Sequence, residues 1–384
     1  MYIIIKCFRS LNFFAGSEQS KRFMAKALSD LELTHQSMES LGKGGVITLL
    51  VEMMMGNLEN KAASLGALQN LVTYEPNKQR LAQTGAVPII LDHLYSLHFP
   101  SNIRESAAAI LQQLVSNNDN AFLIDENGDE LDLNKILRDL LMRIQDNFFS
   151  NSQMIQKQVM LTLLGFVSPR DAHETRKIFS DAHGVMILLP FLKHGDVEIR
   201  NVVVQILYCM LGESGDEICH FIMTTTKLIG LFSMYLDEGV QEEVQAAAVG
   251  ILSRMPVAET NLTLELMEQN VLPMLLHHIR QGSPNLKENA MGALLRFTLP
   301  LDIQIQKKVV DLGIFQALRG LIKSGTTKAK IRAAIALRNL SESTMQLSIP
   351  RKLSGCFFCI LKKPPTVCRV HGGECGERTT FCLI

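Results

Sequence analysis

The sequence predicts an all-α fold in which one helical unit recurs about seven times. An Ala-rich apolar helix is repeated along the chain, and its copies end at Leu71, Leu114, Phe166, Leu211, Met255, Phe297 and Leu340. The steps between successive copies are 43, 52, 45, 44, 42 and 43 residues. In the first copy, Ala62, Leu65 and Leu68 share one face, because residues three apart are neighbours on a helix. A regular period of this length is typical of a stacked repeat array.

A short phrase before most of these helices indicates the kind of array. A small or turn-forming residue precedes an apolar helix start in GGVITLL from Gly44, GAVPIIL from Gly85, HGVMILL from His183, NVLPMLL from Asn270 and GIFQALRGL from Gly313. Glycine permits a sharp bend, and proline is tolerated in the first turn of a helix. A short helix, a bend, a second helix and a long third helix form the armadillo unit, with a period of ~40–47 residues. We therefore predict a right-handed superhelical solenoid of armadillo repeats over residues 21–345.

The longest step contains an acidic segment, DENGDELDLN, from Asp125 to Asn134. Its carboxylate spacing has the pattern of an EF-hand calcium loop. The twelfth position is Ile136, however, where such a loop needs a bidentate Glu. The sequence therefore favours a solvated loop over a calcium site.

Composition bears on the classes of function that remain. Lys plus Arg and Asp plus Glu both number 38 among 384 residues, so the strongly basic surface of a nucleic-acid-binding protein is not evident. No apolar run approaches the ~20 residues of a membrane-spanning helix. Cys7, Cys209 and Cys219 lie among apolar residues, as buried reduced thiols do, which favours a cytoplasmic or nuclear location. Residues 1–20 are predicted to be unstructured or non-native, and residues 346–384 to form a Cys-rich tail.

No catalytic arrangement is found in the sequence. The adjacent His277 and His278 would point about 100° apart on a helix, so they cannot form an i, i+4 metal pair. We interpret them as core or surface histidines. The segments GKGGV at Gly42 and GLIKSGTTK at Gly320 resemble phosphate loops only in composition, because neither follows a predicted strand. We predict no catalytic residue, no required cofactor and no nucleic-acid partner.

A stack of armadillo units offers a long concave surface lined by third helices, which suits an extended peptide or a partner helix. We call the last apolar residue of each long helix its anchor. The positions just before the anchors give the candidate partner-binding residues Asn70, Gln113, Arg254, Arg296, Arg338 and Asn339. The arginines favour an acidic protein partner, although ordinary solvated helix positions explain them equally well. The nuclear-import receptors of this superfamily grip basic peptides with Trp and Asn ladders. This chain has no Trp, which argues against an import role.

Five of the eight cysteines lie near the C-terminus, between Cys356 and Cys382. Cys356, Cys359, Cys368 and His371 form two close pairs with the ligand types of a tetrahedral zinc site. Eight residues between the pairs is shorter than the ~12 or more of finger-like sites, and more than four candidate ligands compete. Three structural interpretations stay open: a zinc site, a reduced thiol-rich loop packed on the last repeat, and disulfides, which a reducing compartment opposes.

Three passages carry a resemblance to a known family: MAKALSDLELTHQSMESLGKGGVITLLVEM, GALQNLVTYEPNKQRLAQTGAVPIIL and CRVHGGECGERTTFCL. They resemble the armadillo region of plant U-box E3 ubiquitin ligases, most closely the senescence-associated, SAUL-like subgroup, from Lys21 to Ile384. The resemblance implies repeats that bind ubiquitination substrates, a U-box that recruits the ubiquitin-loaded E2, and peripheral association with the plasma membrane.

The chain departs from the pattern of that family because no U-box precedes the repeats. We therefore expect a noncatalytic protein-interaction module, the substrate-binding or localising part of a ligase-like protein. The alternative is a fragment of an active U-box E3 ubiquitin-protein ligase whose U-box lies upstream of this chain.

Overall fold

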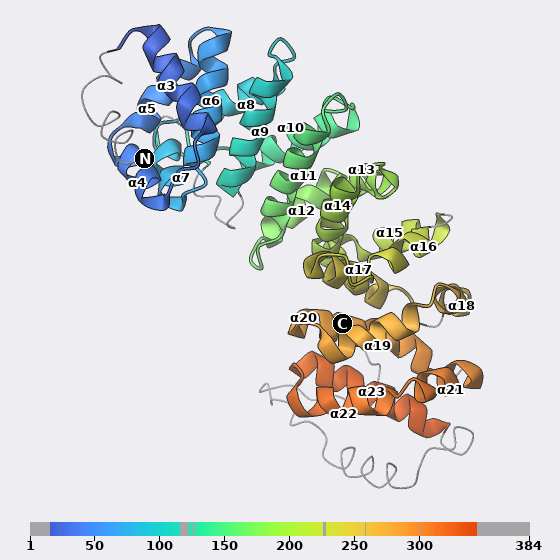
Figure 1. Ribbon diagram of the computed structural model, residues 1–384. Coiled ribbons are helices and arrows are strands. Elements are labelled where there is room, and N and C mark those ends of the chain that lie inside the picture. Colours follow the sequence, from blue (N-terminus) through green and yellow to red (C-terminus); the bar gives the residue numbers. More distant parts are fainter. Residues whose placement is uncertain are drawn as a thin grey trace, which may run out of the picture.

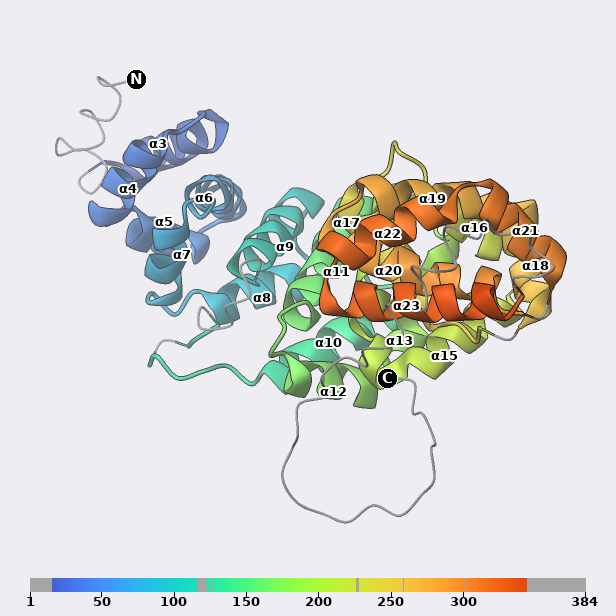
Figure 2. The same ribbon diagram turned by 90° about the horizontal axis from the view of Figure 1, so that it is seen from below.

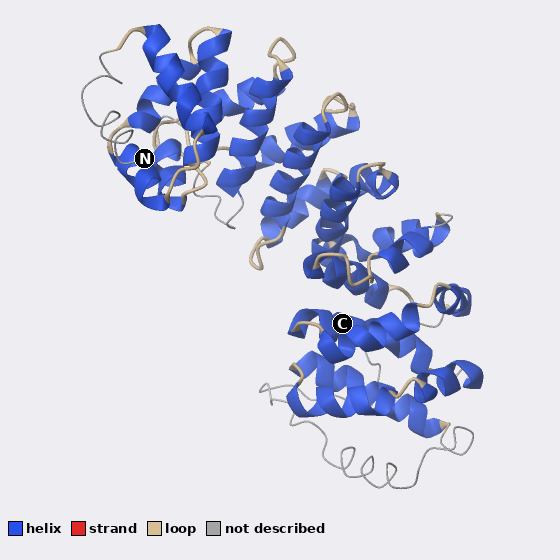
Figure 3. Ribbon diagram, in the orientation of Figure 1, coloured by secondary structure: helices blue, strands red, loops and turns tan. Residues whose placement is uncertain are grey.

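The computed structural model describes residues 16–115, 123–125, 127–225, 228–257, 259–300 and 302–343. In these residues the chain is a stack of helices without a strand, and the one extended pairing is an isolated bridge between Ile124 and Glu130. Figure 1 shows the helices stacking in chain order, and Figure 3 shows short loops and turns joining them. The predicted all-α solenoid is confirmed.

The helices group into units that end in a long third helix. Units 1 and 2 are α4 (His35–Lys43), α5 (Val46–Met54) and α6 (Leu58–Leu71), then α7 (Glu75–Ala82), α8 (Val87–Tyr95) and α9 (Ser101–Val115). Units 3 and 4 are α10 (Leu133–Gln145) and α11 (Gln153–Val167), then α12 (His173–Asp181), α13 (Gly184–Leu188), η2 (Leu189–Lys193) and α14 (Val197–Cys209). Unit 5 is α15 (Leu211–Thr224), α16 (Leu228–Met234) and α17 (Glu242–Arg254). Units 6 and 7 are α18 (Thr260–Glu268), α19 (Val271–Gln281), α20 (Pro284–Leu294) and η3 (Leu295–Thr298), then α21 (Ile303–Asp311), α22 (Ile314–Ser324) and α23 (Thr327–Glu342).

The third helices form one continuous row. The first of them, α3 (Glu18–Asp30), packs on α6, and each third helix then packs on the next as far as α23. Fully buried aromatic side chains, including Phe166 and Phe297, lie in a single apolar core that runs through the stack. In the view of Figure 2, units 1 and 2 extend away from the C-terminal units, which lie behind one another. The row gives the molecule an extended surface instead of one enclosed centre.

A residue in the left-handed conformation precedes the second helix in five units. The φ angles are 79° at Gly45, 67° at Gly85, 56° at His183, 56° at Asn270 and 80° at Gly313. These residues fall in the five phrases that predicted bends. Glycine adopts this conformation without steric cost, and asparagine and histidine tolerate it better than most residues. The bend between the first and second helix is thus encoded locally.

The third unit differs from the predicted three-helix plan. Its described part contains α10 and α11 only, whereas the other units have three helices or more. The acidic segment lies before α10, and Oδ1 of Asp125 accepts the backbone N–H groups of Asn127 and Asp129 at 2.8 and 3.0 Å. These bonds lower the pKa of the Asp125 carboxyl. The longest step between repeats therefore corresponds to a turn at this place.

The register predicted for the fourth repeat is wrong by one residue. Helix α14 ends at Cys209, and Met210 beyond it is 0% exposed, whereas Leu211 opens α15 and is half-buried. Met210 therefore takes the place that Leu71 takes in the first repeat. The apolar pair Met210 and Leu211 made the two registers indistinguishable by hydropathy alone.

Carboxylates at the start of one third helix bind the start of the next. The four pairs are Glu18 with Asn60 Nδ2 (3.1 Å), Glu105 with Ser152 Oγ (2.8 Å), Glu242 with Ser283 N (2.8 Å), and Glu288 with Thr326 Oγ1 (2.8 Å). The start of a helix carries unpaired N–H groups and a partial positive charge, so a carboxylate is favourable there. These contacts align the N-terminal ends of neighbouring third helices.

Two helical glycines are expected to respond oppositely to alanine. A Cβ at Gly320 in α22 would have no heavy atom within 4 Å, whereas a Cβ at Gly292 in α20 would lie 2.8 Å from Cβ of Ser253. We expect Gly320→Ala to raise the free energy of unfolding by about 0.5 to 1 kcal/mol, because alanine favours helix. Gly292→Ala should lower it, since Ser253 must move. Urea denaturation of both variants checks this, and equal signs would contradict the packing.

Candidate interaction surface

Asn70, the first predicted groove residue, binds the end of the preceding third helix. It lies near the end of α6, and its Nδ2 donates to the carbonyl oxygens of Leu28 and Leu31 at 2.8 and 2.7 Å. These carbonyls lie in the last turn and at the C-cap of α3, where no intrahelical donor remains. Asn70 therefore holds α3 against α6 with both of these hydrogen bonds.

Arg296 and Asn339 take the same position in later units. Arg296 is 4% exposed and donates from Nη2 to the carbonyls of Leu252 and Met255, at 3.2 Å each, at the end of α17. Burial lowers the pKa of Arg296 to about 10. Because this value is still well above 7, the guanidinium stays charged at neutral pH. Asn339 donates from Nδ2 to Oγ1 of Thr298, at 3.2 Å, at the end of η3. Like Asn70, these residues connect successive units.

The other three predicted residues lie on separate helices. Gln113 on α9 is half-buried, whereas Arg254 on α17 and Arg338 on α23 are exposed. Nε of Arg338 lies 3.5 Å from Oε1 of Glu342, and an exposed pair of this kind contributes little stability. The six predicted residues are thus distributed over α6, α9, α17, η3 and α23.

A different set of residues lines the third helices, and all but one of them stay partly exposed. We define the third-helix face as the residues five and two positions before the last anchor in units 1 to 4. They are Gly66 and Gln69, Ala109 and Gln112, Leu161 and Leu164, and Gln205 and Tyr208, of which only Ala109 is buried. All eight are uncharged. Gln69 and Gln112 make no side-chain hydrogen bond to another described residue, so their amides are free to bind a ligand.

Tyr208 closes the C-terminal end of the third-helix face. Its hydroxyl accepts a hydrogen bond from Nδ2 of Asn289 in α20 at 2.9 Å, so the ring crosses the intervening α17. A Cβ at Gly250 in α17 would lie 2.1 Å from the Tyr208 ring, so only glycine fits beneath it. Sequence reasoning missed this bridge. Its only signal was a tyrosine where the other units carry Gln, Leu, Ser or Arg, with a glycine one period later.

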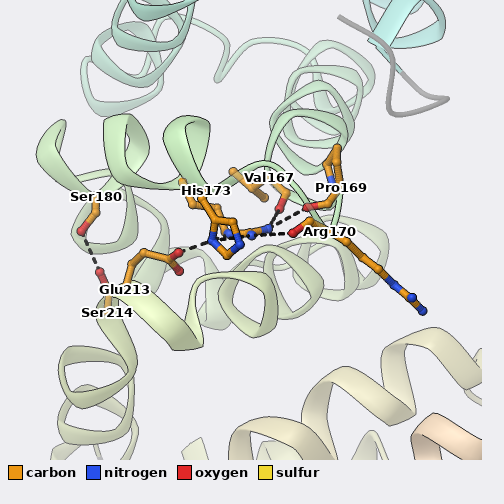
Figure 4. A network of polar contacts seen from close by, with 8 residues as sticks. Val167, Pro169, Arg170, His173, Ser180, Glu213 and Ser214 are labelled. Carbon is orange, nitrogen blue, oxygen red and sulfur yellow. Dashed lines mark hydrogen bonds and ion pairs between the residues drawn. The ribbon is translucent and has the colours of Figure 1, made fainter. Parts of the chain in front are cut away.

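Arg176 in α12 is the centre of a polar network that sequence reasoning also missed (Figure 4). Its Nη1 donates to the carbonyls of Val167 and Pro169 at 2.9 and 2.8 Å, and its Nη2 donates to that of Arg170 at 3.2 Å. Its Nε lies 3.3 Å from Oε1 of Glu213 in α15. Arg176 is 8% exposed, so these partners replace water. The candidate positions predicted from the sequence all lie on third helices. They could not include Arg176, because α12 is the first helix of its unit.

The histidine pair of α19 divides between core and surface, as interpreted from the sequence. His278 is 4% exposed and its Nε2–H donates to the carbonyl of Leu236 at 2.9 Å, whereas the His277 side chain is 47% exposed and lies 3.4 Å from Glu238. Burial lowers the pKa of His278, although the Leu236 carbonyl and the carboxylates of Glu238 and Glu242 oppose this shift. His278 is therefore neutral in the folded protein at neutral pH.

This burial predicts a loss of stability in mild acid. The unfolded chain takes up a proton at His278 as the pH falls through about 6.5, and the folded chain binds it only at lower pH. The free energy of unfolding should therefore decrease from pH 7.5 to 5.5, by at most about 1.4 kcal/mol per pH unit from this residue. Urea denaturation should show a smaller pH dependence for His278→Gln, while His277→Gln keeps the original one. An unchanged slope in His278→Gln would refute this.

The cysteines that the structure describes are not reactive groups. Cys219 is buried, Cys209 is half-buried, and both are free thiols whose pKa burial raises to about 11. Within the described ranges, no three His, Cys, Asp or Glu side chains gather in a way that could hold a metal ion. The candidate zinc ligands Cys356, Cys359, Cys368 and His371 lie outside the described residues, so their zinc site stays a prediction.

The three-helix units, the left-handed bends and the continuous row of third helices define the class of protein: an armadillo-repeat solenoid. A crystal structure of an engineered protein aligns with 88% of this chain and 78% of its own, with a TM-score of 0.59 and 18% identity, and so shares the fold. None of the helices in the described part of the chain has the length and apolar character that a membrane crossing requires. No model of a known protein family matches the sequence.

The homologues of this chain are plant U-box domain-containing proteins. Over 96% of its length it is 23% identical to U-box domain-containing protein 44 of Arabidopsis thaliana and 26% identical to U-box domain-containing protein 24 of Oryza sativa subsp. japonica. The chain spans about half the length of these relatives, 48% and 49% respectively. It is a repeat-based interaction module related to the corresponding part of those proteins.

Proposed function

We propose that the chain is the substrate-binding or localising armadillo module of a plant U-box ubiquitin-ligase-like protein. The observation that supports this most directly is the third-helix face, an uncharged row over four units in which seven of the eight residues are partly exposed. Its free glutamine amides both donate and accept hydrogen bonds, as the backbone of an extended partner segment requires. The homology to U-box domain-containing proteins supports the link to ubiquitin. A cytoplasmic site of action, association with the plasma membrane and restraint of senescence are the corresponding biological proposals.

A photo-crosslinking experiment tests this role. A photo-reactive phenylalanine replaces Gln69 or Gln112 on the third-helix face, and Gln83 or Lys177 serve as exposed control positions at the end of α7 and in α12. The partner captured at Gln69 and Gln112 is then presented, with E1, E2 and ubiquitin, to this chain fused behind the U-box of a relative. We expect ubiquitination of that partner by the fusion, and its loss in Gln69→Arg with Gln112→Arg. Capture only at the control positions would refute the proposal.

A second candidate is that the chain is a fragment of an active U-box E3 ligase. The observation that favours it is the length of the relatives, of which the chain spans about half. Sequencing of full-length transcripts from this locus tests for an in-frame U-box upstream. Ubiquitin-chain formation by the encoded full-length protein, and none by residues 1–384 alone, would establish this candidate.

A further inference from the structure

A pocket opens where units 6 and 7 meet. It has a volume of about 570 Å³ and lies between the second helices α19 and α22, beside the N-terminal ends of α20 and α23. A pocket of this size holds a few side chains of a ligand. None of its lining residues belongs to the third-helix face.

The charged residues that line this pocket are cations only. Arg280 comes from α19 and Lys287 from α20, and no Asp or Glu lines the pocket. Unit 7, residues 302–343, adds to the positive potential with eight Lys or Arg against three Asp or Glu. The carboxylates of Glu242 and Glu288, on the helices that precede α20 and α23 in the row, are already bound to the helix starts at Ser283 and Thr326. The pocket therefore favours an anionic group.

Arg280 is held in position for such a group. Its Nη2 donates to the carbonyl of Leu312 at 2.9 Å, at the end of α21, while its Nε and Nη1 donate to no described residue. Lys287 is half-buried and likewise donates no hydrogen bond within the described residues. A fixed guanidinium loses little freedom when it binds a carboxylate, and its fork matches the two oxygens.

The remaining wall of the pocket is apolar and amide-bearing. Leu321 and Ala329 are buried apolar side chains of α22 and α23, and Gln281 and Gln316 are exposed amides at the rim. Burying an apolar side chain next to the ion pair removes water and strengthens the attraction. We propose that this pocket binds a peptide segment of a partner protein in which an Asp or Glu stands beside an apolar residue.

This inference rests on the proposed function in one respect, that the ligand is a protein segment. Gly320→Leu provides a variant that blocks the pocket, because a Cβ there meets no heavy atom within 4 Å and the helix gains a better helix former. Arg280→Glu with Lys287→Glu reverses its charge. Arg138→Glu with Lys193→Glu is the matched control, since these are exposed cations on α10 and η2.

The experiment is selection of a phage-displayed random dodecapeptide library on residues 1–384, followed by fluorescence anisotropy of the selected peptides. We expect Asp or Glu beside an apolar residue in those peptides, and binding that weakens from 50 to 500 mM NaCl. Gly320→Leu and the charge-reversed variant should each weaken binding at least about tenfold, and the control pair less than about twofold. Peptides without acidic residues, full binding by Gly320→Leu, or no selected peptide would each overturn the proposal. Loss of binding only in the Gln69→Arg with Gln112→Arg variant would assign the peptides to the third-helix face. That outcome would reject the pocket as the binding site but not the proposed function.

Discussion

Replacing Arg176 by leucine is expected to lower the free energy of unfolding by about 3 to 5 kcal/mol, the usual cost of removing one partner from a buried ionic network. The substitution removes the side-chain donor from the carbonyls of Val167, Pro169 and Arg170, of which Pro169 keeps the N–H of Ala172, and leaves Glu213 without its cation. Each unsatisfied buried acceptor carries a desolvation cost. Urea denaturation followed by circular dichroism measures the effect.

Two matched variants separate this network from a general effect of charge. Arg170→Ala removes an exposed arginine six residues away and should change stability by no more than about 0.5 kcal/mol. Arg176→Lys retains the charge but not the planar fork, so it should fall between the wild type and Arg176→Leu. If Arg176→Leu and Arg170→Ala unfold at the same urea concentration, the network does not stabilise the central units.

The second large effect is expected at the crossing of α14 and α17. Gly250→Ala should lower the free energy of unfolding by about 1 to 3 kcal/mol, because a Cβ at this position would lie 2.1 Å from the Tyr208 ring and 2.9 Å from Nδ2 of Asn289. The ring must then leave its place and give up the hydrogen bond to Asn289. Differential scanning calorimetry of the variant measures the loss.

A compensating substitution distinguishes this clash from a loss of helix geometry. Ser253 takes the position equivalent to Tyr208 in the next unit, where it packs against Gly292. Tyr208→Ser should therefore restore part of the stability of Gly250→Ala, with a coupling energy of about 0.5 to 3 kcal/mol in a double-mutant cycle. Additive effects of the two substitutions would show that the residues do not compete for the same space.

The sequence predicted those parts of the fold that local chemistry encodes. The five turn phrases correspond to residues with positive φ, including His183 and Asn270, because the left-handed conformation is a property of single residues. Hydropathy could not choose between Met210 and Leu211 as the fourth anchor, because both are apolar and only their partners distinguish them. The two-helix form of the described part of unit 3 was not predicted from the sequence, in which only the long step with its acidic segment sets this unit apart.

The interaction surface was harder to predict, because the same position on a third helix can either join two units or bind a partner. Asn70 and Arg296 have the side chains of binding residues, yet the structure engages them with the ends of the preceding third helices. Whether such a residue joins two units or binds a partner depends on the distance between the units. That distance is a property of the tertiary structure and cannot be obtained from the spacing of residues in one sequence. Arg280 and Lys287 lie on two helices of unit 6, and only the packing of unit 7 against them, with Leu321 and Ala329, completes the pocket.

The Tyr208 bridge also has a mechanical consequence. In a solenoid in which each unit contacts only its direct neighbours, every interface between two units can flex independently of the others. Tyr208 links α14 to α20 across α17. The interfaces of unit 5 with units 4 and 6 must therefore flex together, or the hydrogen bond between Tyr208 and Asn289 breaks. We therefore expect units 4 to 6 to move as one rigid segment and the molecule to adjust its curvature around a partner mainly outside this segment.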